Sequence, residues 1–271
     1  MGTEDHLVIC LGFRRAGSTL QYNLARTLVE YLKAGCGLGF HLESDALRAC
    51  AQGLQGKGLV GVLKTYNRDL TCLCDLPLKV SILYIYRDLR DVFSSLKKKK
   101  QITDVEEFLV LARSHLDAVE RLRSTHEVLY QKYEDVYSNL EGGTREIAAF
   151  VGLQTTQEDI ARIKALNTVD AAITYIRDHF SLKQRFVNSV NRLMRSQPRK
   201  TKDQARSLGL MRHVRSIIPG GNIVSSGFML HPDHISRSRG QPSAWKRELP
   251  EHEAKLVTEC FRDWLDAHGY T

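Results

Sequence analysis

The sequence lacks a long apolar run. No stretch approaches the ~20 consecutive apolar residues that a membrane-spanning helix needs, so we expect no membrane anchor. The segment from Met1 to His6 is acidic and leads almost directly into an apolar stretch, so we also expect no signal peptide. These two absences together predict a cytoplasmic protein.

The cysteines have no metal-binding pattern. Six cysteines occur in 271 residues, and none forms a C-x-x-C motif. Cys72 and Cys74 form a C-x-C, but no second Cys/His pair with zinc-site spacing follows it. We therefore expect reduced structural thiols and no metal. The chain also shows no internal repeat and no low-complexity tract.

Acidic residues are almost absent from one part of the chain. Residues 181–247 contain 14 Lys and Arg but only two acidic residues, a net charge of +12, whereas the whole chain carries +8 and the remainder therefore −4. This segregation indicates an anionic ligand or a polyanionic surface. We interpret residues 170–230 as a basic insertion or lid. Arg90 and the four lysines at 97–100 are expected on a solvated helix face.

Buried strands alternate with amphipathic helices. Apolar runs of strand length occur at 7–11, 59–63, 80–86 and 128–130, and a short edge strand is expected at 40–43, after a glycine-rich break at 35–39. Ser44 is expected to cap the helix that follows. Helical spacing begins at Leu20 and Thr103 and continues over 140–151, 157–166, most of 168–195, and 250–268. This alternation predicts an α/β three-layer sandwich, a central parallel sheet flanked by helices with a helical and loop-rich C-terminal part, in one domain over residues 1–271.

A glycine loop joins the first strand to the first helix. Gly12 and Gly17 have the G-x-x-x-x-G spacing of a nucleotide-binding P-loop, and Thr19 stands at the Ser/Thr position of that motif. Backbone N–H groups and the helix dipole converge there, so we expect the loop to hold a phosphate or sulfate in a P-loop NTPase-like fold. The lysine of the motif is replaced by Ser18.

Cationic side chains follow the ends of several strands. Arg15, Lys64 and Arg87 all stand at such positions, and the carboxyl ends of parallel strands meet at one edge of the sheet. An Mg-dependent NTPase needs an acid where Arg87 stands. This argues against a kinase or NTPase that uses ATP and Mg, which we keep as an alternative. A non-enzymatic module that binds polyanions is the second alternative.

The ordered set of motifs resembles the sulfotransferases that use 3′-phosphoadenosine 5′-phosphosulfate (PAPS). The segment Arg15-Ala16-Gly17-Ser18-Thr19 resembles their 5′-phosphosulfate loop. The segment from Arg87 to Ser95, with Asp-Val between, resembles their 3′-phosphate motif. Tyr133-Glu134-Asp135, and Ser238-Arg239-Gly240 with Trp245-Lys246, are similar to later family motifs. The resemblance covers about residues 6–153 and 231–271.

The resemblance implies metal-independent, in-line transfer of a sulfuryl group from PAPS to a hydroxyl or amine of a small molecule, for example a natural product. Adenosine 3′,5′-bisphosphate (PAP) is then the product, and neither nucleic acid nor a membrane is expected as a partner. Leu20 occupies a place where some members stack a Trp. The implied cofactor-binding residues are Arg14, Arg15, Ala16, Gly17, Ser18, Thr19, Leu20, Arg87, Ser95, Tyr133, Arg239 and Gly240.

The implied catalytic residues leave the general base open. Lys64, in a Lys-Thr-Tyr that resembles the Lys-Thr-His of the family, is the candidate to stabilise charge on the bridging oxygen. Tyr66 stands where many members carry the His base, and a phenol with a pKa near ~10 is a poor base at neutral pH. We therefore favour Glu43, with His41 and Asp45 behind it. The acceptor and the oligomeric state are not predicted.

Overall fold

The computed structural model describes residues 4–179 and 240–270. Within these residues, parallel strands form a five-stranded sheet in the order β2-β3-β1-β4-β5. The first strand of the chain is therefore the central strand, and all carboxyl ends meet at one edge. The strands are β1 (His6–Gly12), β2 (Gly35–Phe40), β3 (Val60–Lys64), β4 (Lys79–Tyr86) and β5 (Glu127–Lys132).

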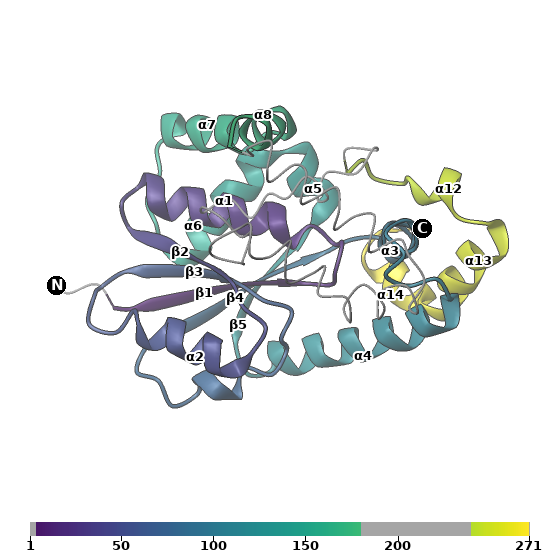
Figure 1. Cartoon of the computed structure of the whole chain (residues 1–271), viewed down its shortest axis with the longest axis horizontal. Coiled ribbons are helices and arrows are strands. Elements are labelled where there is room, and N and C mark those ends of the chain that lie inside the picture. The colour runs from purple at the N-terminus through teal and green to yellow at the C-terminus, as the bar shows by residue number, and fades with distance from the viewer. Residues whose placement is uncertain (1–3, 180–239, 271) are drawn as a thin grey trace, which may run out of the picture.

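Helices cover both faces of the sheet and its carboxyl edge (Figure 1). One face carries α1 (Ser18–Tyr31), α5 (Tyr133–Ser138), α6 (Leu140–Val151), α7 (Gln157–Leu166) and α8 (Val169–His179). The other face carries α2 (Ser44–Gln52), the short 3₁₀ helix η1 (Thr71–Leu73) and α4 (Val105–Arg123). At the carboxyl edge lie α3 (Leu89–Lys98), α12 (Trp245–Glu248), α13 (Glu251–Cys260) and α14 (Arg262–Ala267). The predicted three-layer α/β sandwich is confirmed.

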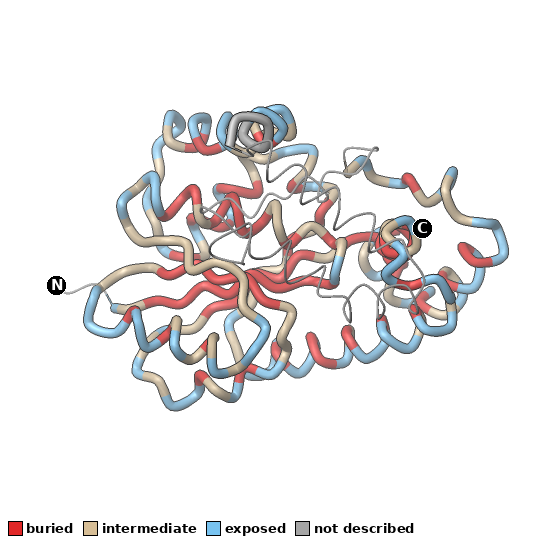
Figure 2. The backbone as a smooth tube through the Cα atoms, viewed as in Figure 1, coloured by how far each residue is buried: buried red, intermediate tan, exposed pale blue. Residues whose placement is uncertain are grey.

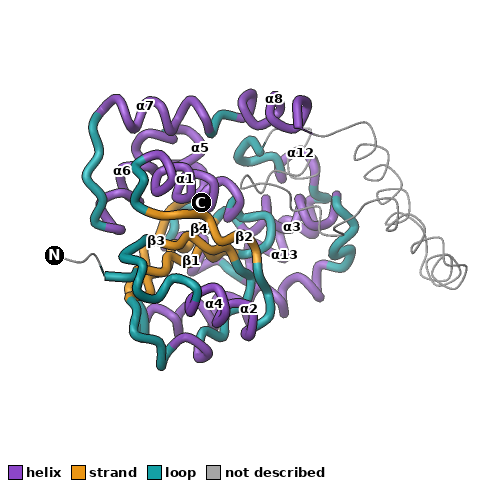
Figure 3. Tube along the Cα trace, turned by 60° about the vertical axis from the view of Figure 1, so that its left-hand side comes forward, coloured by secondary structure: helices purple, strands orange, loops and turns teal. Residues whose placement is uncertain are grey.

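The strand β1 is buried along its whole length, as its continuous apolar run predicts (Figure 2). Its alternate side chains enter two separate hydrophobic clusters, because successive residues of a strand point to opposite faces. Leu7, Ile9 and Leu11 pack against α2 and α4, whereas Val8 and Cys10 pack against α1 and α6. Figure 3 shows the sheet between these helical layers. Among the described helices, none combines the length and apolar composition that crossing a bilayer requires.

The strand β2 differs from the prediction. The glycine-rich stretch expected to be a break is the strand itself, and β2 ends at Phe40, where a strand was expected to begin. Close packing explains the glycines, because a Cβ on Gly35 would lie 1.8 Å from the carbonyl oxygen of Val60. The helix α2 begins at Ser44 and has Glu43 as its N-cap residue, so the expected capping role of Ser44 is wrong.

The C-terminal helix predicted over 250–268 is divided. α13 ends at Cys260 and α14 begins at Arg262, because Phe261 between them has φ −119° and ψ 25°, outside the helical region. The helix expected within 168–195 is found as α8, and its remainder lies outside the described residues. Most of the predicted insertion at 170–230 also lies outside them.

The lysines at the end of α3 are exposed or half-exposed, as expected, but two of them form ion pairs with the C-terminal helices. The Nζ atom of Lys97 lies 2.5 Å from a carboxylate oxygen of Glu253, and Lys98 pairs with Glu248. Arg90 is only 7% exposed, so the expected solvated position is wrong for this residue. These contacts attach α3 to α12 and α13 and fix the C-terminal part against the carboxyl edge of the sheet.

Candidate active site

The loop between β1 and α1 has the geometry of an anion-binding loop. Gly17, the residue before α1, has φ +108°, a conformation that favours glycine. Arg15 has φ +73°, which is uncommon for a residue with a side chain. The N–H groups of Ser18 and Thr19 precede the first complete helical turn and have no intrahelical acceptor. The first turn of α1 contains no acid, so nothing in that turn opposes the attraction of its N-terminus for an anion.

Lys64 lies beside this loop, at the end of β3. Its side chain is only 2% exposed, and its Nζ donates a hydrogen bond of 2.6 Å to Oγ1 of Thr19. The same nitrogen lies 5.1 Å from the ring centre of Tyr66 and 5.7 Å from that of Phe40. Burial lowers the pKa of the Lys64 ammonium, and the nearby Tyr66 opposes this shift. A bound anion would also favour the charged form.

Arg87 forms a second cationic position, after β4. It is 8% exposed, and its Nη2 donates to the Asp91 carboxylate at 3.2 Å and to the carbonyl oxygen of Gln241 at 3.0 Å. Its Nε is buried and has no hydrogen-bond acceptor within the described residues. A buried N–H without an acceptor is costly, so this arrangement fits an additional anionic ligand.

A hydrogen bond connects the two cationic regions. The Nε atom of Arg15, in the loop, donates to Oγ of Ser95, on α3, at 2.9 Å. The resemblance assigns these two residues to different phosphate groups of one cofactor. Their direct contact brings the loop and the first turns of α3 to the same site, although 80 residues separate them in sequence.

Tyr133 lies at the centre of the predicted site. A Cβ on Gly17 would lie 2.3 Å from Cδ2 of Tyr133, so the ring packs directly on the loop. The guanidinium carbon of Arg87 lies 4.5 Å from the ring centre, and the Tyr133 hydroxyl donates to the carbonyl oxygen of Gly240 at 2.8 Å. Burial raises the pKa of Tyr133 to about 12, so the phenol stays a neutral donor at neutral pH.

Among the predicted base candidates, the ring centre of Tyr66 lies 5.1 Å from Nζ of Lys64, and the backbone N–H of His41 donates to the carbonyl oxygen of Lys64 at 3.1 Å. His41 is held by its own segment, because its Nε2 makes a 2.9 Å hydrogen bond with the carbonyl oxygen of Leu38. Glu43 is exposed at the N-cap of α2. Within the described residues, no hydrogen bond or ion pair joins the side chain of His41 or Glu43 to that of Lys64.

The other predicted cofactor residues have varied positions. Ala16 is buried in the loop, and Leu20 is partly buried against the cluster beneath α1. Arg14 is exposed, with its guanidinium carbon 5.8 Å from the ring centre of Tyr66. Arg239 lies outside the described residues.

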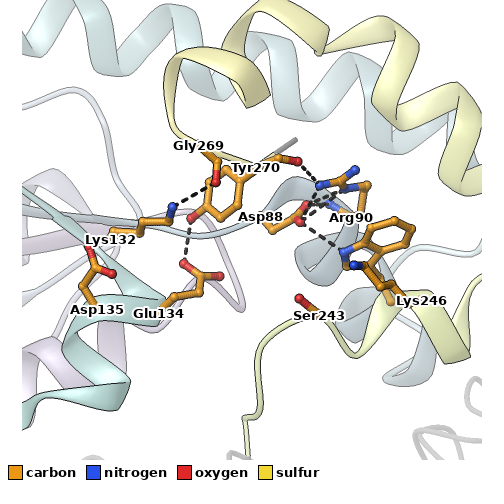
Figure 4. Close-up of a pocket in the computed structure, with 10 residues that line it drawn as sticks. Asp88, Arg90, Lys132, Glu134, Asp135, Ser243, Lys246, Gly269 and Tyr270 are labelled. Atoms are coloured by element: carbon orange, nitrogen blue, oxygen red, sulfur yellow. Dashed lines mark hydrogen bonds and ion pairs between the residues drawn. The ribbon is translucent and has the colours of Figure 1, made fainter.

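A polar pocket of about 330 Å³ is lined by residues that follow β4 and β5, among them Asp88, Arg90 and Glu134 (Figure 4). Asp88 is central to its wall, because its carboxylate accepts from Arg90 at 2.8 Å and from the indole Nε1 of Trp245 at 3.1 Å. Opposite, the Tyr270 hydroxyl donates to Glu134 at 2.7 Å, as Figure 4 shows. The contacts close the C-terminal part against the ends of β4 and β5.

Sequence reasoning missed Asp91 as a member of this site. Its carboxylate accepts hydrogen bonds from Arg87 and from the backbone N–H groups of Ser243 and Trp245. Asp91 was visible as part of the motif that begins at Arg87, but no spacing rule connects it with residues more than 150 positions later.

Comparisons with known proteins agree with this geometry. Residues 75–205 match the family model described as "Sulfotransferase domain". The comparison with curated proteins gives no significant match.

Solved sulfotransferase-like structures share the fold. A retinol dehydratase in complex with androsterone and the inactive cofactor PAP has a TM-score of 0.53 at 15% identity, and the alignment covers 98% of this chain and 81% of that one. Mouse sulfotransferase SULT7A1, complexed with PAP, has a TM-score of 0.51 at 14% identity, covering 97% and 85%. Retinol dehydratase with retinol and PAP has a TM-score of 0.50 at 16% identity, covering 98% and 82%. The family match over residues 75–205 and the fold shared with these structures agree with the resemblance to sulfotransferases seen in the sequence.

Proposed function

We propose that this protein transfers a sulfuryl group from PAPS to a hydroxyl or amine of a small molecule, without a metal ion. The observation that carries the proposal is Arg87. It is a buried cation whose Nε lacks an acceptor within the described residues, at a strand end where an Mg-dependent NTPase needs an acid. The three similar structures contain PAP, and a second anion pocket is what the 3′-phosphate of that nucleotide requires.

The chain offers a separate group of residues to each end of the cofactor. We assign the 5′-phosphosulfate to the loop, where the N–H groups of Gly17, Ser18 and Thr19 point away from α1. We assign the 3′-phosphate to Arg87 and Ser95, with Gly240 and Arg239 completing that pocket. Tyr133 and Leu20 are assigned to the adenine side. Arg15 supports both ends, because it belongs to the loop and donates to Ser95.

PAPS, when bound, supplies an activated sulfuryl group on a phosphate leaving group. In the transfer, the S–O bond to that phosphate breaks, a new bond forms to the acceptor oxygen or nitrogen, and a base takes the proton of the acceptor. We assign to Lys64 the stabilisation of the negative charge that develops on the bridging oxygen, and the contact of its buried ammonium with Thr19 in the loop supports this role. Desolvation makes this interaction stronger than it would be in water.

The candidates for the base differ in their exposure and in their contacts with Lys64. The ring of Tyr66 lies 5.1 Å from Nζ of Lys64, which supports Tyr66 as the base, whereas Glu43 is exposed at the start of α2. Androsterone and retinol, bound in the similar structures, are small hydroxylated molecules, which supports an acceptor of that size. A natural product as acceptor, a single domain over residues 1–271 and a cytoplasmic location remain predictions.

The alternatives receive less support. A kinase or NTPase would need the loop lysine that Ser18 replaces. The polyanion-binding module depends on the basic segment 181–247, most of which lies outside the described residues. The lysines at 97 and 98 on α3, which would extend a basic surface, are paired with Glu253 and Glu248 instead.

Calorimetric titration with PAP in the absence of metal tests the proposal, with ATP and Mg as the comparison ligand. We expect PAP to bind and Arg87→Ala to weaken it by ~30-fold or more, as expected when a buried charge-assisted contact is lost. Arg121→Ala, which removes the same charge from an exposed position on α4, is the matched control. Binding of ATP with Mg but not of PAP would reject the proposal, and equal losses in both variants would favour non-specific polyanion binding. A screen of phenols, alcohols and amines with labelled PAPS follows a positive result.

A further inference from the structure

The carboxylate of Asp91 is the meeting point of two segments that are far apart in sequence. It is 2% exposed, on the first turn of α3. Its Oδ2 accepts from Nη2 of Arg87 at 3.2 Å and from the backbone N–H of Ser243 at 2.8 Å, and its Oδ1 accepts from the backbone N–H of Trp245 at 2.9 Å. Asp91 therefore holds the side chain of Arg87 and the segment 243–245 in one arrangement.

Arg87 contacts the same C-terminal segment a second time. Its Nη2 also donates to the carbonyl oxygens of Gly240 at 3.4 Å and Gln241 at 3.0 Å. The guanidinium, the carboxylate and the backbone of 240–245 thus form a closed set of hydrogen bonds. A change in any one member is expected to shift the others.

The electrostatic position of Asp91 is unfavourable for the ligand that Arg87 is proposed to bind. A buried carboxylate 3.2 Å from Arg87 reduces the positive charge that a phosphate would meet, and like charges repel strongly where water is excluded. An aspartate here therefore lowers affinity for the anion unless it contributes something else. The geometry indicates that this contribution is the fixed position of Arg87 and of the segment 240–245.

We propose that Asp91 is a positioning residue for the 3′-phosphate of the cofactor, which it orders indirectly by holding Arg87 and the segment 240–245 in the binding arrangement. This inference rests on the proposed function, since it concerns the same nucleotide site. An amide cannot replace the carboxylate, because both oxygens of Asp91 accept backbone N–H groups. The Nδ2 group of an asparagine would face one of those N–H groups, donor against donor.

The experiment compares two nucleotides on two variants of the full chain. PAP carries the 3′-phosphate, and 5′-AMP lacks it. We expect Asp91→Asn to raise the dissociation constant of PAP by ~10-fold or more and to leave that of 5′-AMP within about twofold, because only the 3′-phosphate depends on Arg87. Glu107→Gln removes one acidic charge from an exposed position on α4 and is expected to change neither value.

A second measurement needs no substitution. In the wild-type protein, saturating PAP should slow amide hydrogen exchange at Ser243 and Trp245, and 5′-AMP should not, since coupling between the ligand and these bonds is reciprocal. Equal weakening of PAP and 5′-AMP by Asp91→Asn would reduce Asp91 to a structural role and overturn the inference. Tighter PAP binding by the variant, or unchanged exchange at both amides, would also overturn it. Failure of the wild-type chain to bind PAP at all would instead reject the proposed function.

Discussion

Replacing Gly17 by alanine tests whether the contact between the phosphate loop and Tyr133 shapes the site. The substitution introduces two separate penalties. Gly17 has φ +108°, where a residue with a Cβ is strained by ~1–2 kcal/mol. The new Cβ would also lie 2.3 Å from Cδ2 and 2.9 Å from Cε2 of Tyr133. The ring must then retreat by roughly 1 Å to reach van der Waals distance.

The size of the second penalty depends on how firmly Tyr133 is held. Its ring is buried, stacked under Arg87 and tied to Gly240 by the hydroxyl, so it cannot rotate away without losing those contacts. Overpacking of a buried position typically costs ~1–3 kcal/mol. We therefore expect Gly17→Ala to lower the free energy of unfolding by ~2–5 kcal/mol.

Gly152→Ala is the matched control for backbone strain. Gly152 has φ +80°, and a Cβ there would meet nothing within 4 Å, so this variant should lose only the ~1–2 kcal/mol of strain and keep its affinity for PAP. Urea denaturation of both variants measures the difference, and calorimetry measures PAP binding. Tyr133→Ala combined with Gly17→Ala should cost less than the sum of the single changes, because the clash is gone. Equal stability losses at Gly17 and Gly152, with unchanged PAP affinity, would refute the reasoning.

Further predictions concern Lys64, which we propose as the catalytic cation, and the ends of the sheet. Lys64→Met should reduce the initial rate of sulfuryl transfer by ~10²–10³-fold. The free energy of unfolding in urea should stay unchanged or rise, because folding of the variant does not remove an ammonium group from water. A normal rate would exclude the proposed role of Lys64. Burial, aided by the Lys79 ammonium, lowers the pKa of His6 to about 4 in the folded state, below its unfolded value near ~6.5. The unfolded chain then binds the proton first, so stability present above about pH 6.5 should fall by on the order of 1–3 kcal/mol as the pH drops towards 4. A flat urea midpoint over that range, or an unaltered slope in His6→Gln, would contradict this. Tyr270→Phe removes the hydroxyl that donates to Glu134, whose pKa burial already raises, and should cost ~1–3 kcal/mol by thermal unfolding, whereas Tyr31→Phe on the exposed end of α1 should cost almost nothing.

Apolar patterning predicted the parts of the fold that depend on burial. The runs that became β1, β3 and β4 are largely buried strands, the run at 128–130 lies in the half-buried edge strand β5, and α7 begins and ends where its helical spacing indicated. β2 was not predicted because its glycines allow the backbone to pack closely on β3 and α1, and the strand has no continuous apolar run. A side chain at Gly35 would collide with β3, and one at Gly37 would collide with α1, so this strand is rich in glycine. Glycine-rich segments ordinarily indicate a break between elements, which is why the strand was not predicted.

The site was predictable only where its residues follow strand ends. Topology alone brings Lys64 and Arg87 to the carboxyl edge, and the spacing of the loop glycines indicates the proposed anion site. The contacts of Asp91 with Ser243 and Trp245 follow no periodicity, since they depend on how the C-terminal segment returns over α3. The burial of Arg90 could not be predicted for the same reason. Its ion-pair partner Asp88 is only two residues away, but Trp245, whose ring covers it, lies far away in the sequence.

The pairing of α3 with the C-terminal helices has a consequence for how the protein responds to ionic strength. The Lys97–Glu253 and Lys98–Glu248 pairs are partly exposed, so ions at concentrations of ~0.15 M and above, where the Debye length is ~8 Å or less, screen them. The Asp88–Arg90 pair beneath them is buried and escapes this screening. Added salt should therefore loosen the outer edge of the C-terminal part while its inner attachment holds. Salt sensitivity of nucleotide binding would then report on the protein's own helices as well as on the charged ligand.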